Sequence, residues 1–350
     1  ATAPFVTDAI RKRCENEVLG YTGKPDSYYN AIINWVKQRY DLIVTKEVIN
    51  FVPGIVPGIG MAMNCFTQKG DKVMIQPPVY HPFAWVTTRN ERTLVINPLR
   101  WENGMYRMDL DAFREQIKGC KLFILCNPHN PGGVVWTEAE LRAIADICYD
   151  EKVLVFSDEI HADLTLPPHT HRPFATVSEK ARMNSVTFMS PSKAFNMPGL
   201  SASHALIFNE DLRKRFRIYM DAGELDMGHV FAFLSVEVAY SHGTEWLDQC
   251  LAYIQGNIDF VDEFLKKHAP KIKAIRPEAS YLVWLDCREL ELSQKDLNEF
   301  FVDKAHLALN DGEMFGKEGI GFMRLNVASP RCIIEKAMKQ LADAYQLYIK

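Results

Sequence analysis

Short apolar runs alternate with amphipathic helical stretches between about residues 45 and 210. Continuous apolar runs of this kind are typical of strands buried on both faces of a largely parallel sheet. Thr137 is a candidate N-cap with Glu140 as its capping-box partner, which predicts a helix over residues 137–150. Such alternation predicts an α/β architecture with right-handed crossovers. The predicted strands are 72–76, 93–97, 121–126, 153–157, 186–190 and 204–208.

The pattern changes after Gly243. Residues 245–268 have the spacing of one long amphipathic helix, which Pro270 ends. A strand over 280–285, a helix from Ser293, a glycine-rich turn, a strand over 321–325 and a last helix from Pro330 are predicted to follow. We therefore expect an N-terminal segment and large domain over 1–246 and a smaller α+β domain over 247–350.

Composition narrows the class of protein. The 350 residues are 47% hydrophobic and 24% charged, as in ordinary globular proteins, and this length suggests two domains. A net charge of −4 argues against a nucleic-acid binder and gives no sign of a membrane partner. No apolar stretch is long enough to cross a bilayer. The eight cysteines are scattered without a C-x-x-C pair, which predicts reduced, buried thiols and a cytoplasmic location.

Polar side chains follow three of the predicted strands. Asn130 lies in the Asn-Pro-His-Asn-Pro-Gly-Gly stretch after residue 126, Asp158 follows residue 157, and Ser190-Pro-Ser-Lys193 follows residue 189. Singly, each has an ordinary explanation: a turn, a helix cap, or a solvated lysine. Because ligands bind beyond the carboxyl ends of parallel strands, their convergence predicts a site containing an amide, a carboxylate and a lysine.

Four motifs give the chain a resemblance to a known family. They are Asn-Pro-His-Asn-Pro-Gly-Gly (127–133), Ser-Asp-Glu-Ile-His (157–161), Ser-Pro-Ser-Lys-Ala-Phe-Asn (190–196) and Phe-Met-Arg-Leu-Asn (322–326). The chain resembles the fold-type I, aspartate-aminotransferase-like enzymes that use pyridoxal 5'-phosphate (PLP), and most closely the MalY/PatB-type cystathionine β-lyases. The resemblance covers essentially the whole chain. It implies a large domain with a mostly parallel seven-stranded sheet between helices, plus a smaller α+β C-terminal domain.

The resemblance implies roles that chemistry can justify. Lys193 would hold PLP as a Schiff base and, once freed by the substrate amine, take the Cα proton. Asp158 would keep the pyridine nitrogen protonated, so that the ring acts as an electron sink. Asn130 would donate to the phenolic oxygen, and the ring of Tyr80 would stack on the pyridine. Arg324 would grip the substrate α-carboxylate through its bidentate guanidinium.

A phosphate site is expected where the segment 51–58 enters an apolar helix. Gly54 permits close backbone approach, and the N–H groups of Ile55 and Val56 would point at the anion, which a helix N-terminus favours. Ser190 and Ser192 would add hydroxyl groups.

Three further positions bear on the assembly, on phosphate binding and on the branch of the family. Tyr21 matches a tyrosine that reaches the phosphate from the neighbouring subunit, which implies a homodimer; a local loop aromatic is the alternative. Ser201 stands where many aminotransferases carry a phosphate-binding arginine. His161, counted among the cofactor-binding residues, stands where many carry a tyrosine, and this variant favours the C–S lyase branch.

Three functions are compatible with these residues. The preferred hypothesis is a carbon–sulfur β-lyase that converts an amino-acid thioether such as cystathionine to a thiol, pyruvate and ammonia. The alternative is a class I/II aminotransferase on the same scaffold. A non-catalytic regulator is the third, although nothing in the sequence marks a partner surface. His169 and His171 have no third metal ligand nearby, so an exposed loop is expected there and no metal.

Overall fold

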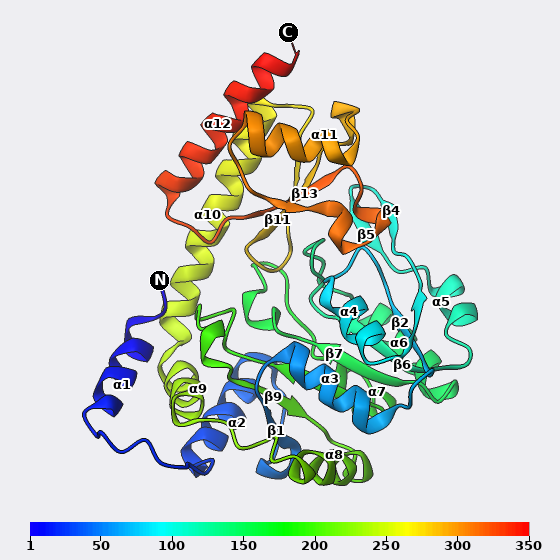
Figure 1. Ribbon diagram of the computed structural model, residues 1–350, viewed down its shortest axis with the longest axis vertical. Coiled ribbons are helices and arrows are strands. Elements are labelled where there is room, and N and C mark those ends of the chain that lie inside the picture. The colour runs from blue at the N-terminus through cyan, green and yellow to red at the C-terminus, as the bar shows by residue number, and fades with distance from the viewer. Residues whose placement is uncertain (350) are drawn as a thin grey trace.

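The computed structural model describes residues 1–349 and has a large and a small sheet, each with its own helices (Figure 1). The large sheet has seven strands in the order β1-β9-β8-β7-β6-β2-β3, and only β9 runs antiparallel to its neighbours. This confirms the mostly parallel seven-stranded sheet. Its strands are β1 (Ile49–Val52), β2 (Lys72–Ile75), β3 (Thr93–Ile96), β6 (Cys120–Cys126), β7 (Leu154–Asp158), β8 (Ser185–Met189) and β9 (Ser203–Leu206).

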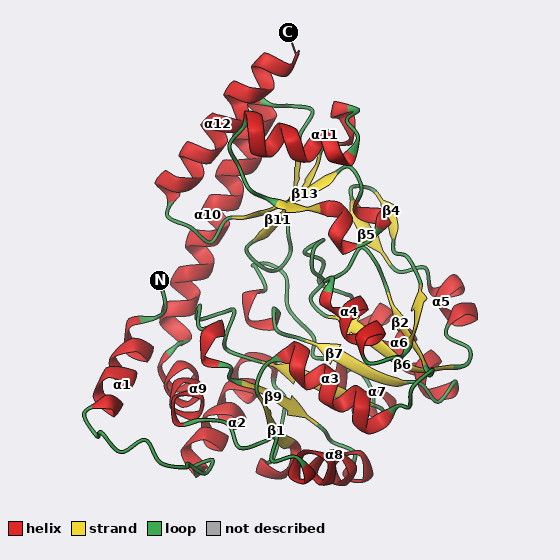
Figure 2. Cartoon of the chain, in the orientation of Figure 1, coloured by secondary structure: helices red, strands yellow, loops and turns green. Residues whose placement is uncertain are grey.

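Helices cover both faces of this sheet, as Figure 2 shows. Side chains alternate along a strand, so Val73 and Ile75 pack on one face and Met74 on the other. Both sets are buried, which explains why the strands appear in the sequence as continuous apolar runs. One face is covered by α3 (Ile55–Phe66), α4 (Pro82–Arg89) and α8 (Glu210–Ala222), and the other by α5 (Leu110–Gln116), α6 (Glu138–Asp150) and α7 (Glu179–Met183).

The predicted strands and helix ends agree closely with the structure. Thr137 caps α6, and the reciprocal contact with Glu140 completes the predicted capping box. The strand β1 was not predicted from the pattern, because polar Asn50 interrupts a short run. Two short strands, β4 (Arg100–Glu102) and β5 (Met105–Arg107), form a separate hairpin that was also not predicted.

The C-terminal part is built on a four-stranded antiparallel sheet in the order β10-β11-β13-β12. The expected domain boundary at residue 246/247 falls inside the long helix α10, so it stays a prediction. The strands are β10 (Lys273–Ile275), β11 (Leu282–Asp286), β12 (Asn310–Asp311) and β13 (Phe322–Asn326), and the helices are α10 (Thr244–His268), α11 (Gln294–Glu299) and α12 (Arg331–Ile349).

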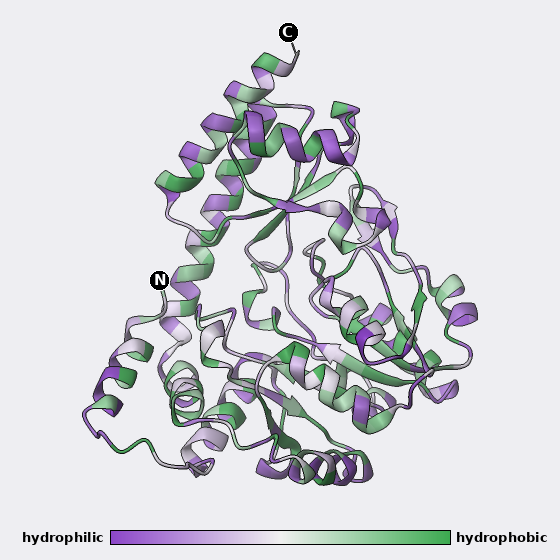
Figure 3. Ribbon diagram, in the orientation of Figure 1, coloured by the Kyte–Doolittle hydropathy of each residue, from purple (hydrophilic) through white to green (hydrophobic). Residues whose placement is uncertain are grey.

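A third group of helices lies beside the large sheet at the lower left of Figure 1. The helix α9 (Val230–His242) packs against α1 (Pro4–Cys14) and α2 (Asp26–Tyr40). Apolar residues concentrate on the strands of the large sheet, whereas polar residues are frequent on the outer helices (Figure 3). Among residues 1–349, no helix has the length and apolar character needed to span a membrane.

Candidate active site

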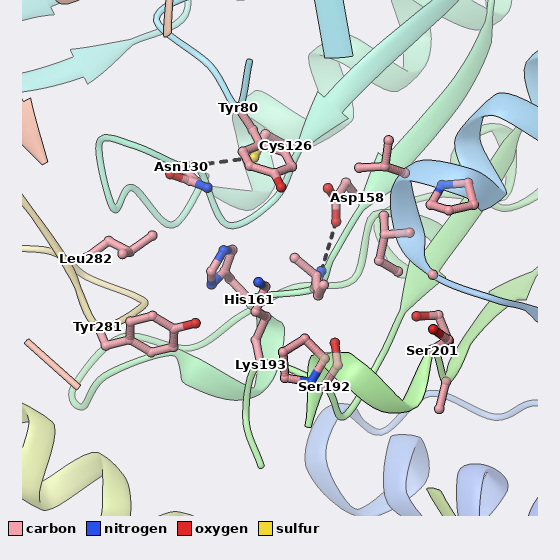
Figure 4. A pocket seen from close by; sticks show the side chains of 18 of the residues that line it. Tyr80, Cys126, Asn130, Asp158, His161, Ser192, Lys193, Ser201, Tyr281 and Leu282 are labelled. Carbon is pink, nitrogen blue, oxygen red and sulfur yellow. Dashed lines mark hydrogen bonds between the residues drawn. The ribbon is translucent and has the colours of Figure 1, made fainter. Parts of the chain in front are cut away.

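A cavity of about 350 Å³ lies at the carboxyl ends of the central strands (Figure 4). Asp158 is the last residue of β7, Asn130 follows β6 by four residues, and Lys193 follows β8 by four. Parallel strands end at one edge of the sheet, which is why separate motifs meet here. The lining residues are Pro53–Pro57, Tyr80, Cys126, Asn130, Asp158, Ile160, His161, Ser192, Lys193, Pro198, Ser201–Ser203, Tyr281, Leu282, Arg324 and Asn326.

Asp158 is a carboxylate held in the interior, with 3% of its surface exposed. Its Oδ1 accepts a hydrogen bond from the Ile160 N–H at 3.1 Å. Burial raises the pKa of Asp158 to about 7, and the charge of nearby Glu159 acts in the same direction, against the N–H of Ile160 and the charge of Lys193. A cationic N–H donor placed at this carboxylate would stabilise its ionised form.

Lys193 reaches the same cavity from the loop after β8. Burial lowers the pKa of its ammonium group; Asp158 opposes this shift and the positive charge of Arg324 adds to it. A lysine with a lowered pKa is more readily available as the free amine that nucleophilic and general-base chemistry require.

Ser190 is hydrogen-bonded within the loop that carries Lys193 and does not line the cavity. Its Oγ donates to the Ala202 carbonyl at 2.7 Å and accepts from the Ser192 N–H at 3.1 Å. Ser192, in contrast, is a lining residue. Direct contact of Ser190 with a phosphate therefore stays a prediction.

Arg324 lies on β13 and faces the cavity from the small sheet. Its Nη1 donates to Asn130 Oδ1 at 2.9 Å and its Nη2 to Asn310 Oδ1 at 2.7 Å. The ring of Phe315 lies under the guanidinium, 4.6 Å from Cζ, and the buried Nε has no partner among the described residues. Burial lowers its pKa to about 10. Neutral amide oxygens do not balance this charge, so the site favours an anion.

Asn130 is fixed by its neighbours. Its backbone N–H donates to Cys126 Sγ at 3.3 Å, while its side-chain oxygen is used by Arg324. The amide NH₂ group is therefore the part of this side chain that remains for a ligand. The following turn is tight: Gly133 has φ +69°, and a Cβ there would lie 2.5 Å from Pro277.

The N-terminus of α3 forms another wall of the cavity. Gly54 precedes the helix with φ +152°, a conformation that favours glycine, and a Cβ there would lie 3.3 Å from Pro57 Cδ. The first N–H groups of a helix have no partner within it, and those of Ile55 and Val56 are at this end. The first turn of α3 carries no acidic residue. This wall can bind an anion through backbone donors.

Tyr80 and His161 line the middle of the cavity. Burial raises the pKa of Tyr80, with a further contribution from Asp158, so its phenol stays protonated. Burial, together with the charges of Lys193 and Arg324, lowers the pKa of His161 to about 3, so its imidazole is neutral. The stacking role of Tyr80 and the cofactor contact of His161 stay predictions.

Tyr21 lies outside this cavity in the single chain. It is 98% exposed and borders a separate shallow hollow with Asp221, Glu224, Asp226 and Met227. The structure of one chain thus brings together all the predicted site residues except Ser190 and Tyr21.

The sequence did not predict that residues of the small sheet other than Arg324 line the cavity. Tyr281 and Leu282 line the cavity at the start of β11. The run 280–285 was predicted as a strand, but nothing in its apolar pattern indicated which residues face a ligand. Cys126 was also missed because it had the pattern of a strand residue.

The expectation of an exposed loop at His169 and His171 was wrong for His171. Its side chain is buried, and its Nε2 lies 2.8 Å from the buried carboxylate of Glu159. Glu159 also accepts from Ser157 Oγ and the Phe174 N–H, each at 2.8 Å. This contact explains why the loop folds inward. Within residues 1–349, no group of three or more metal-ligating side chains is found.

The thiols agree in part with the prediction from the cysteine pattern. All eight cysteines are free, and Cys120, Cys126, Cys148 and Cys287 are buried. The prediction of buried thiols is wrong for Cys14 and Cys332, which are exposed because they lie on the outer helices α1 and α12.

Known proteins match the chain over nearly its whole length. It is 37% identical to the cystathionine β-lyase PatB of Bacillus subtilis over 341 residues, 97% of this chain and 88% of that protein. It is 29% identical to the protein MalY of Escherichia coli, over 98% and 88% of the two chains. The PLP-containing structure of cystalysin from Treponema denticola superposes with a TM-score of 0.97 at 34% identity, over 100% and 89%. The PLP-bound C–S lyase of Staphylococcus hominis gives 0.92 at 33%, over 99% and 88%. The family model described as aminotransferase class I and II matches residues 3–341, and the chain belongs to that family.

Proposed function

We propose that the chain is a PLP-dependent carbon–sulfur β-lyase acting on L-amino-acid thioethers. One observation carries the proposal: Lys193, the buried Asp158 and the uncompensated Arg324 line the same cavity. Such chemistry needs an amine, a carboxylate and a cationic group that binds the substrate carboxylate. The similarity to PatB and to the C–S lyase of Staphylococcus hominis supports lyase over transaminase chemistry.

The residues present fit PLP at both of its ends. The N–H groups of Ile55 and Val56, with Ser192, suit a phosphate. At the other end, the buried carboxylate of Asp158 suits a protonated pyridine nitrogen, because that cation would stabilise its ionised form. When bound, PLP supplies an electron sink for negative charge at the substrate Cα.

The side chains of this chain then have distinct tasks. Arg324 would bind the α-carboxylate, held in place by Asn130 and Asn310. Lys193 would take the Cα proton on Nζ, which its lowered pKa makes available as the free amine. Asn130 would direct its NH₂ group at the phenolic oxygen, because its own oxygen is already engaged.

The test is a comparison of two assays on the purified holoenzyme. Release of pyruvate from L-cystathionine without any keto-acid acceptor is the expected result. Strict dependence on a keto acid, with amino-group transfer in place of pyruvate release, would show an aminotransferase and overturn the proposal. The visible absorption band of the purified protein checks the cofactor separately.

We infer a homodimer in which Tyr21 reaches the phosphate site of the neighbouring subunit. The inference is supported by the position of Tyr21, which is exposed and is not among the residues that line the cavity of its own chain. Mixing inactive Tyr21→Ala and Lys193→Ala chains would create one intact site in each hybrid dimer. Recovered activity is expected, and no recovery on chain exchange would place Tyr21 outside the site.

A cytoplasmic location remains part of this proposal. It is supported by eight free cysteines, of which Cys14 and Cys332 are exposed and would be vulnerable in an oxidising compartment. Fractionation of the native host, with activity followed in each fraction, tests the location.

A further inference from the structure

Tyr281 is a phenol that lines the cavity beside Leu282. It directly precedes β11, and its ring meets that of His161 edge-on, with the centroids 6.2 Å apart and the planes at 70°. Figure 4 shows its hydroxyl pointing toward His161 and Lys193. Burial raises its pKa, so the phenol carries its proton and can donate it.

His161 is the polar residue whose ring packs edge-on against Tyr281. Only 4% of the histidine is exposed, and its buried Nδ1 has no partner among residues 1–349. Leaving a buried polar nitrogen unpaired costs free energy, so such a group at a cavity wall indicates a ligand or a reacting partner. Its neutral imidazole can orient a phenol without introducing a charge.

Besides Tyr281, Tyr80 and Lys193 could supply a proton in the cavity. The two phenols come from different parts of the fold. Tyr80 follows β2 of the large sheet, and the charges of both Asp158 and Arg324 act on its pKa. Tyr281 directly precedes β11, which pairs with β13, the strand that carries Arg324, and both side chains line the cavity. Tyr281 therefore lies at the carboxylate clamp, where the substrate and its side chain would be held. Lys193 is occupied with the Cα proton.

We propose that Tyr281 is the acid that protonates the leaving sulfur and that His161 orients its hydroxyl. This inference rests on the lyase function proposed above. The Cα–H bond breaks and the proton goes to Lys193 Nζ, while its electron pair forms a Cα=Cβ double bond. The Cβ–S bond breaks, the sulfur keeps that electron pair, and it takes the proton of Tyr281 Oη. The Lys193 ammonium then returns a proton to the phenolate, which the nearby Arg324 stabilises.

Leaving-group dependence tests this role. An alkyl thiolate is a basic leaving group that benefits from protonation, whereas chloride is not basic and needs no acid. In Tyr281→Phe, we expect kcat for L-cystathionine to fall by about 100-fold, within the usual range for general acid catalysis, and kcat for β-chloro-L-alanine to stay nearly unchanged. The affinity for PLP and the visible band should match those of the parent enzyme, because Tyr281 does not hold the cofactor.

The comparison variant is Tyr80→Phe, which removes the other phenol. In Tyr80→Phe, kcat should fall by a similar factor for both substrates, because Tyr80 is proposed to stack on the pyridine ring of the cofactor. Equal losses for both substrates in Tyr281→Phe, or an increase in KM alone, would make Tyr281 a carboxylate-binding residue and overturn the proposal. No loss for either substrate would leave Lys193 as the donor and overturn it as well.

The same measurements separate this inference from the function on which it rests. If the parent enzyme releases pyruvate from neither substrate, the lyase proposal itself fails. His161→Leu should lower the cystathionine rate, and adding Tyr281→Phe should cause little further loss, because residues that act as a unit are not additive. Full additivity would contradict the assignment of His161 as the orienting residue.

Discussion

The two halves of the cavity come from different sheets, one from the strand ends of the large, mostly parallel sheet and the other from the small antiparallel sheet. Asn130, Asp158 and Lys193 stand at the ends of parallel strands whose other residues form the core, whereas Tyr281, Asn310 and Arg324 come from a small antiparallel sheet. In the first half Asp158 and Asn130 are buried, with 3% and 5% of their surface exposed, and Lys193 is half-buried; in the second half Tyr281 and Arg324 are half-buried and Asn310 is exposed. The first half therefore suits a resident cofactor, and the second suits a substrate that must enter and leave.

Burial explains why the two halves should respond differently to mutation. A charge held in the interior has a large effect on its neighbours, because little water screens it. A hydrogen bond at the rim is exchanged for water at small cost. Variants of the strand-end half should lower kcat, and variants of the carboxylate-binding residues of the small sheet, Arg324 and Asn310, should mainly change KM, whereas Tyr281, as the proposed proton donor, should change kcat.

The largest loss is expected for Lys193→Ala. This change removes the amine that would bind the cofactor covalently and accept the Cα proton, so turnover should fall by about 10⁴-fold or more. The visible band of the bound cofactor should disappear, while circular dichroism and the melting temperature show an intact fold. Substantial turnover in this variant would contradict the central role of the residue.

Asp158→Asn should be the next most damaging change. An amide cannot stabilise a protonated pyridine nitrogen by charge, so the variant should bind PLP but lose about 10³-fold in kcat, as expected for an electrostatic term of about 4 kcal/mol. The measurement is kcat with saturating cofactor. Full activity in this variant would refute the role assigned to Asp158.

The same variant should be more stable than the parent when the cofactor is removed. Burial raises the pKa of Asp158 from 3.8 to about 7, so the folded state binds more protons than the unfolded state between these values. Stability should therefore fall as pH rises through this window, by up to about 4 kcal/mol. Asparagine does not ionise, so the apo variant should gain stability relative to the apo parent at pH 8, and the difference should vanish near pH 4.

Urea unfolding of both apo proteins at pH 4, 6 and 8 checks the stability difference. Saturating PLP should reduce the advantage of the variant at pH 8, because the ring cation would then balance the carboxylate. A pH-independent difference would show that the buried carboxylate does not titrate in this range.

Sequence reasoning predicted the strand-end half well and the small-sheet half poorly, for a physical reason. Lys193 and Asp158 follow apolar runs directly, so the geometry of a parallel sheet alone brings them together. Tyr281 and Asn310 become neighbours of Arg324 only through the packing of the small sheet, and local patterns do not encode that packing. His171 was misplaced for the same reason, since its partner Glu159 belongs to another motif.

Arg324→Lys is a direct test of the small-sheet half. A lysine can carry the charge but not the paired hydrogen bonds, so the KM for the substrate should rise by about 100-fold. The value of kcat should change much less, because the cofactor half is intact. Steady-state kinetics with L-cystathionine separate the two parameters. A loss confined to kcat would place Arg324 in the cofactor half and abolish the distinction between the two halves.

Asn310 should give the smallest effect, because this residue is exposed and contacts Arg324 at the solvent side. Its Oδ1 accepts from Arg324 Nη2 at 2.7 Å, so Asn310→Asp places a carboxylate where the guanidinium already donates. The new ion pair would compete with the substrate carboxylate, and because exposed pairs contribute up to about 1 kcal/mol, KM should rise by about fivefold. Asn310→Ala removes the contact without adding a competitor and should change KM by about twofold or less. If the aspartate variant affects KM no more than the alanine variant, the guanidinium does not bind the substrate carboxylate, and the anion that Arg324 favours must be sought elsewhere.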